Sequence, residues 1–292
     1  MVEKQTTIGG LKANYIELNR TDQNSKNPLH LHAANGFPLG SYQSFIEPFT
    51  RKHHITGLES RGMWPERGQP KRQTSWQLYA DYLIEFLEQT NKCSGEIQRF
   101  IGIGHSLGGS VTLIAAIKRP DLFQKLVLIE PATTPSRFTA FVWQYLPRIA
   151  EHSIPLVSRT LLRRKHWPSK VEFIKYHSSK TAFKNCTVQA MQDYAEYGLR
   201  NHPDNRYELA YSTEWEAHNF RKVHYTLGLL RKVKVPTLLI AGATSYFYNA
   251  YAARQQMIEK HKYLNLEILK NTGHLAPFEN PTGAQTCILD WL

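Results

Sequence analysis

The sequence predicts an α/β fold in which a mostly parallel central sheet is flanked by helices. Short apolar runs that are typical of strands alternate with longer segments of helical periodicity, and this alternation reaches almost to the C-terminus. At 292 residues, the chain is long enough for one such domain with an insertion. The expected strands are residues 14–18, 29–34, 54–58, 100–103, 125–129, 237–241 and 264–269.

Helices are expected over residues 75–89, 110–118, 249–262 and 283–292. The segment 134–221 interrupts the alternation, because it has helix-compatible stretches but no strand run of the same kind. Its large aromatic residues could form the core of a small helical unit or line a pocket. They are Phe138, Phe141, Trp143, Tyr145, Trp167, Phe173, Tyr176, Phe183, Tyr194 and Tyr197.

Ser106 lies in the pattern G-x-S-x-G, between the expected strand 100–103 and a helix-compatible stretch. A serine hydroxyl needs a neighbouring base and an unobstructed backbone to act as a nucleophile. Gly104 and Gly108 allow a tight strand-to-helix turn in which Cβ atoms would collide. The pattern therefore indicates a nucleophilic serine.

His274 follows the expected strand 264–269 on a loop, where its imidazole can reach a turn on a neighbouring strand. Its ordinary pKa suits a general base near neutral pH. The order serine, then histidine near the C-terminus, matches one hydrolase architecture. The other twelve histidines are expected to be surface or packing residues.

Together these motifs resemble the α/β-hydrolase fold superfamily. They are NGFP at 35–38, ESRG at 59–62, GHSLGG at 104–109, VPTLLIAG at 235–242 and GHLAPFENP at 273–281. The resemblance implies that Ser106 is the nucleophile and His274 the base. It also implies an oxyanion hole formed by the backbone amides of Phe37 and Leu107, although Asn35 stands where the family often has histidine. Residues 1–133 and 222–292 would form the hydrolase core, and 134–221 a cap that sets substrate choice.

The acid of the triad departs from the common pattern. The family most often has an aspartate where this chain has Ser245, and a hydroxyl can orient His274 but supports catalysis poorly. In some members the acid lies one strand further along the chain than the serine. The corresponding strand here is 125–129, and Glu130 follows it directly. A carboxylate there can also be structural. We expect Glu130 to be the acid.

The composition bears on the compartment of the protein and on the kinds of partner it can bind. Hydrophobic residues make up 41% and charged residues 21%, as in globular proteins, and we expect neither stable membrane insertion nor a secretory signal. Three widely separated cysteines suggest neither a disulfide framework nor a zinc site, so the cytoplasm is the expected compartment. The net charge is +12, but no nucleic-acid module is recognisable. We expect a solvated basic face at the cluster Arg159, Arg163, Arg164, Lys165 and His166, with attraction of an anionic substrate or lipid surface as the alternative.

The expected function is that of a serine hydrolase acting on a small-molecule ester or acyl substrate, without metal or organic cofactor. Two alternatives remain open: hydrolysis of a carbon–carbon bond on the same fold, and ligand binding by a catalytically weakened scaffold. His105 disfavours the first, since members of that branch usually have asparagine there. Dehalogenases and epoxide hydrolases are disfavoured because Ser106 occupies the place of their aspartate nucleophile. The sequence does not predict the oligomeric state.

Overall fold

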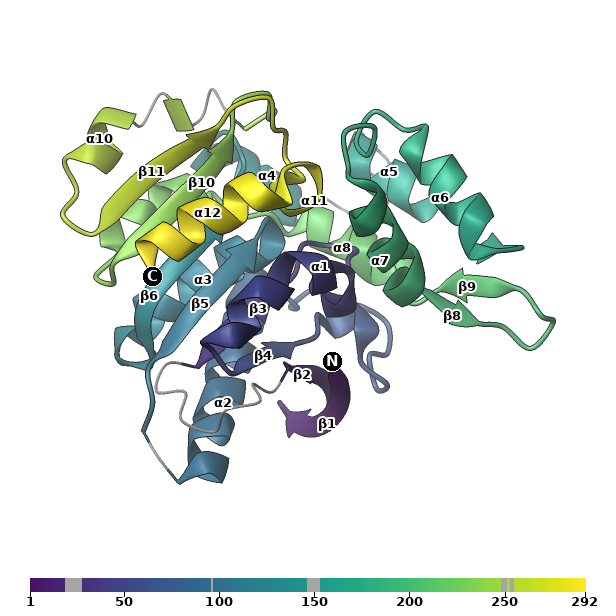
Figure 1. Cartoon of the computed structure of the whole chain (residues 1–292), viewed down its shortest axis with the longest axis horizontal. Coiled ribbons are helices and arrows are strands. Elements are labelled where there is room, and N and C mark those ends of the chain that lie inside the picture. Colours follow the sequence, from purple (N-terminus) through teal and green to yellow (C-terminus); the bar gives the residue numbers. More distant parts are fainter. Residues whose placement is uncertain (19–27, 96, 146–152, 248–250, 253–254) are drawn as a thin grey trace.

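The computed structural model describes residues 1–18, 28–95, 97–145, 153–247, 251–252 and 255–292. Its main sheet has eight strands in the order β1-β2-β4-β3-β5-β6-β10-β11 (Figure 1). The pairs β1–β2 and β2–β4 are antiparallel, and all others are parallel. The predicted fold class is therefore confirmed. The strands are β1 Val2–Ile8, β2 Leu11–Leu18, β3 Leu29–His32, β4 Ile55–Leu58, β5 Phe100–His105, β6 Phe123–Ile129, β10 Thr237–Gly242 and β11 Leu264–Leu269.

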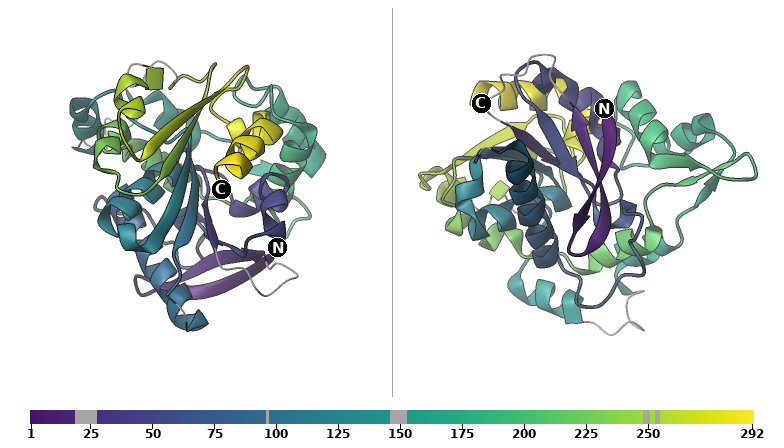
Figure 2. Two further views of the ribbon diagram at one scale, coloured as in Figure 1. Left: turned by 60° about the vertical axis from the view of Figure 1, so that its left-hand side comes forward. Right: turned by 90° about the horizontal axis from the view of Figure 1, so that it is seen from below.

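Helices cover both faces of this sheet. In the left view of Figure 2, blue helices lie on one side of the strands and the yellow α12 on the other. Because side chains alternate along a strand, Leu126 and Leu128 of β6 join the core on the α2–α3 side, whereas Val127 and Ile129 join the opposite core. The helices of this part are α1 Gln43–Ile46, α2 Trp76–Ser94, α3 Leu107–Lys118, α10 Gln255–Glu259, α11 Ala276–Glu279 and α12 Pro281–Trp291.

Most predicted elements are present, with shifted ends. Ser75 caps α2 through its side chain, and the helix continues to Ser94 before Gly95 ends it in a left-handed conformation. The predicted helix 249–262 extends beyond the observed one, because α10 ends at Glu259. Positions 248–250 and 253–254 lie outside the described residues. Strand β1 was missed because it is mostly exposed and lacks apolar alternation.

Most described elements of residues 134–221 form a group beside the main sheet, whereas Trp143 packs against the core on the α2–α3 side. In Figure 1, α5, α6, α7 and the hairpin β8–β9 project to the right of the main sheet. The group is not purely helical, since β7, β9 and β8 form an antiparallel sheet in that order. The elements are α4 Arg137–Tyr145, α5 Pro155–Leu161, β7 His166–Trp167, α6 Lys170–Ser178, α7 Val188–Gly198, β8 Leu199–Asn201, β9 Tyr207–Leu209 and α8 Thr213–Arg221. The helices of the described ranges include none that is long and apolar enough to cross a membrane.

The aromatic residues of this group divide by burial. Trp167, Phe173 and Tyr194 are at most 2% exposed and pack against one another, whereas Phe138 and Phe141 of α4 are 76% and 61% exposed. These three residues therefore form core, and Trp143 and Phe183 pack against the cores while partly buried, whereas Phe138 and Phe141 do not belong to a core.

Glu59 lies directly after β4, and we expect it to make the stability of the fold depend on pH. Its carboxyl group is buried, where it accepts a hydrogen bond from the Leu39 amide, and burial raises its pKa from 4.5 to about 8. Between these values the folded state holds one proton more than the unfolded chain. The free energy of unfolding should therefore fall as the pH rises through this window, by up to about 1.4 kcal/mol per pH unit.

We expect Glu59→Gln to remove this dependence, because the amide is neutral at every pH. Urea unfolding at pH 5 and pH 8 measures the effect. The variant should lose less stability than the parent between the two values. A parent protein as stable at pH 8 as at pH 5, with no difference from Glu59→Gln, would show that Glu59 is ionised in the folded state.

Candidate active site

Ser106 sits between β5 and α3 with backbone angles that are rare outside glycine, φ 54° and ψ −115°. Two glycines make this turn possible. A Cβ atom on Gly104 would lie 2.5 Å from the Gly108 carbonyl oxygen, and one on Gly108 would lie 2.1 Å from the His32 carbonyl oxygen at the end of β3. Local strain of this kind is common at functional sites.

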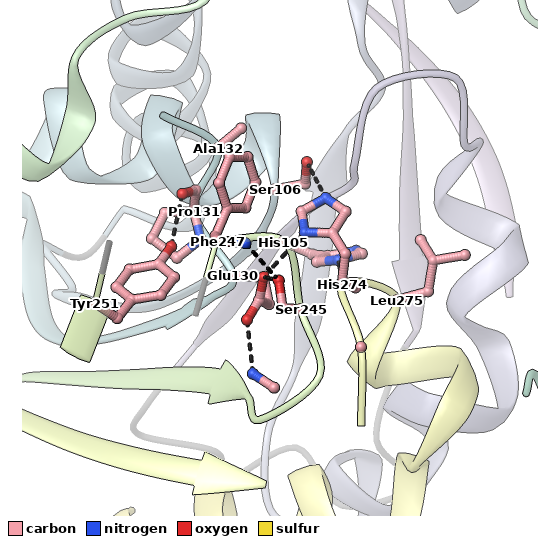
Figure 3. A network of polar contacts seen from close by, with 12 residues as sticks. His105, Ser106, Glu130, Pro131, Ala132, Ser245, Phe247, Tyr251, His274 and Leu275 are labelled. Carbon is pink, nitrogen blue, oxygen red and sulfur yellow. Dashed lines mark hydrogen bonds and ion pairs between the residues drawn. The ribbon is translucent and has the colours of Figure 1, made fainter. Parts of the chain in front are cut away.

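His274 reaches Ser106 from the loop after β11. Its Nε2 lies 3.0 Å from Ser106 Oγ, and its Nδ1 lies 3.1 Å from Glu130 Oε2 (Figure 3). A carboxylate oxygen can only accept, so Nδ1 carries the proton and Nε2 is left with a lone pair facing the serine hydroxyl. The imidazole is therefore held in the tautomer that a general base for Ser106 requires.

The carboxylate of Glu130 is completely buried at the end of β6. Oε1 accepts a hydrogen bond from the Gly242 amide at 2.6 Å, and Oε2 accepts one from Ser245 Oγ at 2.5 Å, in addition to the contact with His274. Glu130 also has a left-handed backbone, with φ 47°. Donors of this kind replace the water that a buried carboxylate loses, and they fix its direction.

Ser245 contacts the acid rather than the histidine. A direct contact of Ser245 with His274 is expected from the sequence, but the Ser245 hydroxyl donates to Glu130 and accepts a hydrogen bond from the Phe247 amide at 3.1 Å. Ser245, at the position where the resembled family often has an aspartate, therefore supports the Glu130 carboxylate directly after β6. The rings of Tyr246 and Phe247 lie 4.9 and 5.2 Å from the His274 ring.

The two predicted oxyanion donors lie in different settings. Leu107 is the first residue of α3, where a backbone amide has no acceptor within the helix. The Phe37 amide, by contrast, donates to the Ala34 carbonyl oxygen at 3.2 Å in a turn. An oxyanion at Phe37 must share or replace this bond.

Asn35 fastens the loop that carries Phe37 to α8. Its Nδ2 donates to the Glu216 carbonyl oxygen, and its Oδ1 accepts from Asn219 Nδ2, both at 2.9 Å. Asn219 Oδ1 in turn accepts from the Tyr79 hydroxyl at 2.7 Å. The asparagine that replaces the family's histidine thus joins the loop, α8 and α2 in one buried network. In the sequence, the only sign of this role is that position 35 is asparagine where the family often has histidine.

Arg163 corrects the interpretation of a solvated basic face. Its side chain is only 17% exposed, pairs with Glu216 Oε2 at 2.7 Å and contacts the Tyr194 hydroxyl. A Cβ atom on Gly36 would lie 2.7 Å from the Glu216 carboxyl group, so this ion pair packs against the Asn35–Phe37 loop. Arg164, Lys165 and His166 are exposed, although Lys165 pairs with Glu214.

His105 holds the loop of His274, a role that the sequence analysis did not assign. Its Nε2 donates to the His274 carbonyl oxygen at 2.9 Å, so in the neutral ring Nδ1 accepts from the Tyr42 hydroxyl at 2.6 Å. Burial lowers the pKa of His105 to about 3, with a smaller contribution from His274, which keeps the ring neutral. The only sign of this role in the sequence is the position of His105 directly before Ser106.

Comparison with known families agrees with this geometry. The model of a family described as "Alpha/beta hydrolase family" matches residues 29–284, which include Ser106, Glu130 and His274. The chain belongs to the alpha/beta hydrolase family. The resemblance inferred from the sequence is therefore confirmed.

Known members of this fold differ in activity. Human "Epoxide hydrolase 4" is 23% identical over 286 residues, covering 93% of this chain and 73% of that protein. "Strigolactone esterase RMS3" from Pisum sativum is 28% identical over 105 residues, 34% of this chain and 38% of that protein. The crystal structure of E-2-(acetamidomethylene)succinate hydrolase superposes with a TM-score of 0.78 at 18% identity, covering 99% and 98% of the two chains. These similarities support a hydrolase on this fold without specifying its substrate.

Proposed function

We propose that this alpha/beta hydrolase is a serine hydrolase that cleaves carboxylic esters or related acyl compounds through an acyl-enzyme. The observation that carries the proposal is the continuous contact from Ser106 Oγ through the His274 ring to the buried Glu130 carboxylate. This arrangement of nucleophile, base and acid activates a serine hydroxyl. The epoxide hydrolase relative does not alter the proposal, because Ser106 stands at the nucleophile position.

The reaction follows from these contacts. Ser106 Oγ attacks the acyl carbon while its proton passes to His274 Nε2, and Glu130 stabilises the resulting imidazolium. The amides of Leu107 and Phe37 stabilise the oxyanion of the tetrahedral intermediate. His274 then protonates the leaving alcohol, and the acyl group remains on Ser106. Water, deprotonated by His274, attacks the acyl-enzyme, and release of the carboxylic acid returns the proton to Ser106.

Hydrolysis of short p-nitrophenyl esters by tag-free protein tests this proposal, with and without a metal chelator. We expect turnover that the chelator leaves unchanged, because no step uses a metal ion. Absence of turnover with every acyl length, together with failure of Ser106 to react with a fluorophosphonate, would favour the ligand-binding alternative. Release of carboxylate from a diketone but not from esters would favour the carbon–carbon alternative.

We further propose that residues 134–221 act as a cap over a hydrolase core formed by 1–133 and 222–292. Two contacts support a cap that reaches the reacting loop: the Phe37 ring stacks on Tyr194 with centroids 4.7 Å apart, and Asn35 binds the Glu216 carbonyl oxygen. A change in the cap can therefore alter the acyl site without touching the triad.

Substitution of Phe183 tests the cap. Its ring stacks on Tyr194 at 5.7 Å and lies 6.2 Å from Phe37, so Phe183→Ala opens space beside the Asn35–Phe37 loop. We expect kcat/KM to rise for longer acyl chains relative to acetate, with unchanged fluorophosphonate labelling of Ser106. Leu162→Ala, at a residue that is 86% exposed, is the control. An acyl-length profile identical to that of the parent would contradict a role for this part of the cap in specificity.

A further inference from the structure

Two histidines and a glutamate meet on one face of the small sheet in the 134–221 segment. His166 of β7 pairs directly with Glu208 of β9, and Glu208 pairs with Arg200 of β8. His202 comes two residues after Arg200, so strand periodicity places its side chain on the same face. One nitrogen of each histidine and one Glu208 oxygen all lie within 4.8 Å of one another. In the described part of the chain, this is the group of side chains that could hold a metal ion.

We propose that His166, His202 and Glu208 bind a zinc ion. Two imidazole nitrogens and one carboxylate oxygen form a set that Zn²⁺ accepts, with a fourth position left for water. In a tetrahedral site with bonds of about 2.0–2.2 Å, the ligand atoms lie about 3.4 Å apart, so atoms that are now within 4.8 Å must approach by up to about 1.4 Å. Side-chain rotation suffices for this movement, because His166 is exposed and the other two are partly exposed.

Asp204 prepares His202 for this role. The Asp204 carboxylate lies 2.7 Å from His202 Nδ1, which must therefore carry the proton. The lone pair is then on Nε2, available to a metal. A carboxylate that fixes the far nitrogen of a ligating histidine is a common support of zinc sites, and its loss typically weakens binding about 10- to 100-fold.

Neighbouring cations oppose metal binding and set its strength. Arg200 Nε donates to Glu208 Oε1 at 2.8 Å, and Arg67 and Lys165 line the adjoining cavity of about 170 Å³. Glu208 Oε2 remains for the metal, while repulsion by Arg200 lowers the affinity. Removal of the Arg200 charge should therefore tighten zinc binding.

A zinc ion here would link β7 to the β8–β9 hairpin, outside the triad. The three ligands are separated by 36 and 6 positions in the sequence, a spacing that resembles no metal motif. This spacing therefore gives no local signal for a metal site. The site is independent of the proposed esterase activity, because none of its ligands contacts Ser106, Glu130 or His274 among the described contacts.

Competition with a chromophoric chelator tests the site on tag-free full-length protein titrated with Zn²⁺. We expect one equivalent to bind, and the absorption of bound Co²⁺ to show a tetrahedral site. His202→Gln and Glu208→Gln should lower the affinity at least about 100-fold, and Asp204→Asn about 10-fold. Arg200→Gln should raise it. His261→Gln, a partly exposed histidine near β11, and His274→Gln, in the triad, should bind zinc as the parent does.

Thermal denaturation shows whether the variants are folded. Zinc should raise the Tm of the parent and of His261→Gln but not that of His202→Gln. The proposal is overturned if the parent binds no zinc at 100-fold molar excess, if His202→Gln binds it as tightly as the parent, or if Arg200→Gln weakens binding. Zinc binding that disappears only in His274→Gln would assign the metal to the triad instead.

Discussion

Ser106→Ala should lower kcat for ester hydrolysis by about 10⁴- to 10⁶-fold, because it removes the atom that forms the acyl-enzyme. The KM should change little, since the hydroxyl contributes mainly after the substrate has bound. Steady-state kinetics with p-nitrophenyl acetate, after correction for spontaneous hydrolysis, measures both constants. The fold should persist, because among the described side chains the Ser106 hydroxyl forms a hydrogen bond with His274 only.

His274→Gln should have an effect of similar size, and the double variant should lose little more than either single one. Residues that act as one unit give losses that do not add. Ser110→Ala is the matched control: this buried serine lies one turn further along α3 and its hydroxyl binds the Ala132 carbonyl oxygen at 2.7 Å. Losses that multiplied in the double variant would show that Ser106 and His274 act separately.

Glu130→Gln should lower kcat by about 10⁴-fold, the loss recorded for the comparable change in a serine protease. The amide keeps the shape of the carboxylate but not its charge, so it no longer stabilises the imidazolium. It can also present its NH₂ group to His274 Nδ1, which favours the wrong tautomer. Measurement of kcat at several pH values separates this loss from a shift in the pH optimum.

Ser245→Ala is the control for Glu130→Gln, because it removes one hydrogen bond to the same carboxylate but no charge. We expect a loss of about 10-fold, which corresponds to the lower end of the roughly 1.5–3 kcal/mol that one hydrogen bond to a charged group is worth, because the Gly242 amide still holds Glu130. In Glu130→Gln with Ser245→Asp, a carboxylate returns beside His274 and part of the activity should return. A folded Glu130→Gln variant as active as the parent would mean that Glu130 does not act as the acid.

The central strands and the position of the site were predictable from the sequence. Strands such as β6 are buried on both faces and therefore appear as continuous apolar runs, which end at the edge where Ser106 and Glu130 lie. The order of the motifs along the chain indicated the family. The catalytic roles of Ser106, His274 and Glu130 stay predictions, although the structure brings their side chains into contact.

Features that depend on tertiary partners were missed. Arg163 appears solvated in a basic run, but its burial depends on Glu216, 53 positions later. The two- and three-residue strands β7–β9 are too short to show alternation, so the group His166, His202 and Glu208 had no local signal. The part of Asn35 in the loop network likewise depends on Asn219, which lies on α8.

The site of covalent labelling by a fluorophosphonate shows directly whether Ser106 is the nucleophile. The parent, treated with the probe and digested, should carry the adduct on the peptide that contains Ser106, at one probe per chain by intact mass. Ser106→Ala should remain unlabelled, while Ser110→Ala is labelled at the rate of the parent. A probe that modifies a different residue, or that labels Ser106→Ala as fast as the parent, would contradict the assignment of Ser106 as the nucleophile.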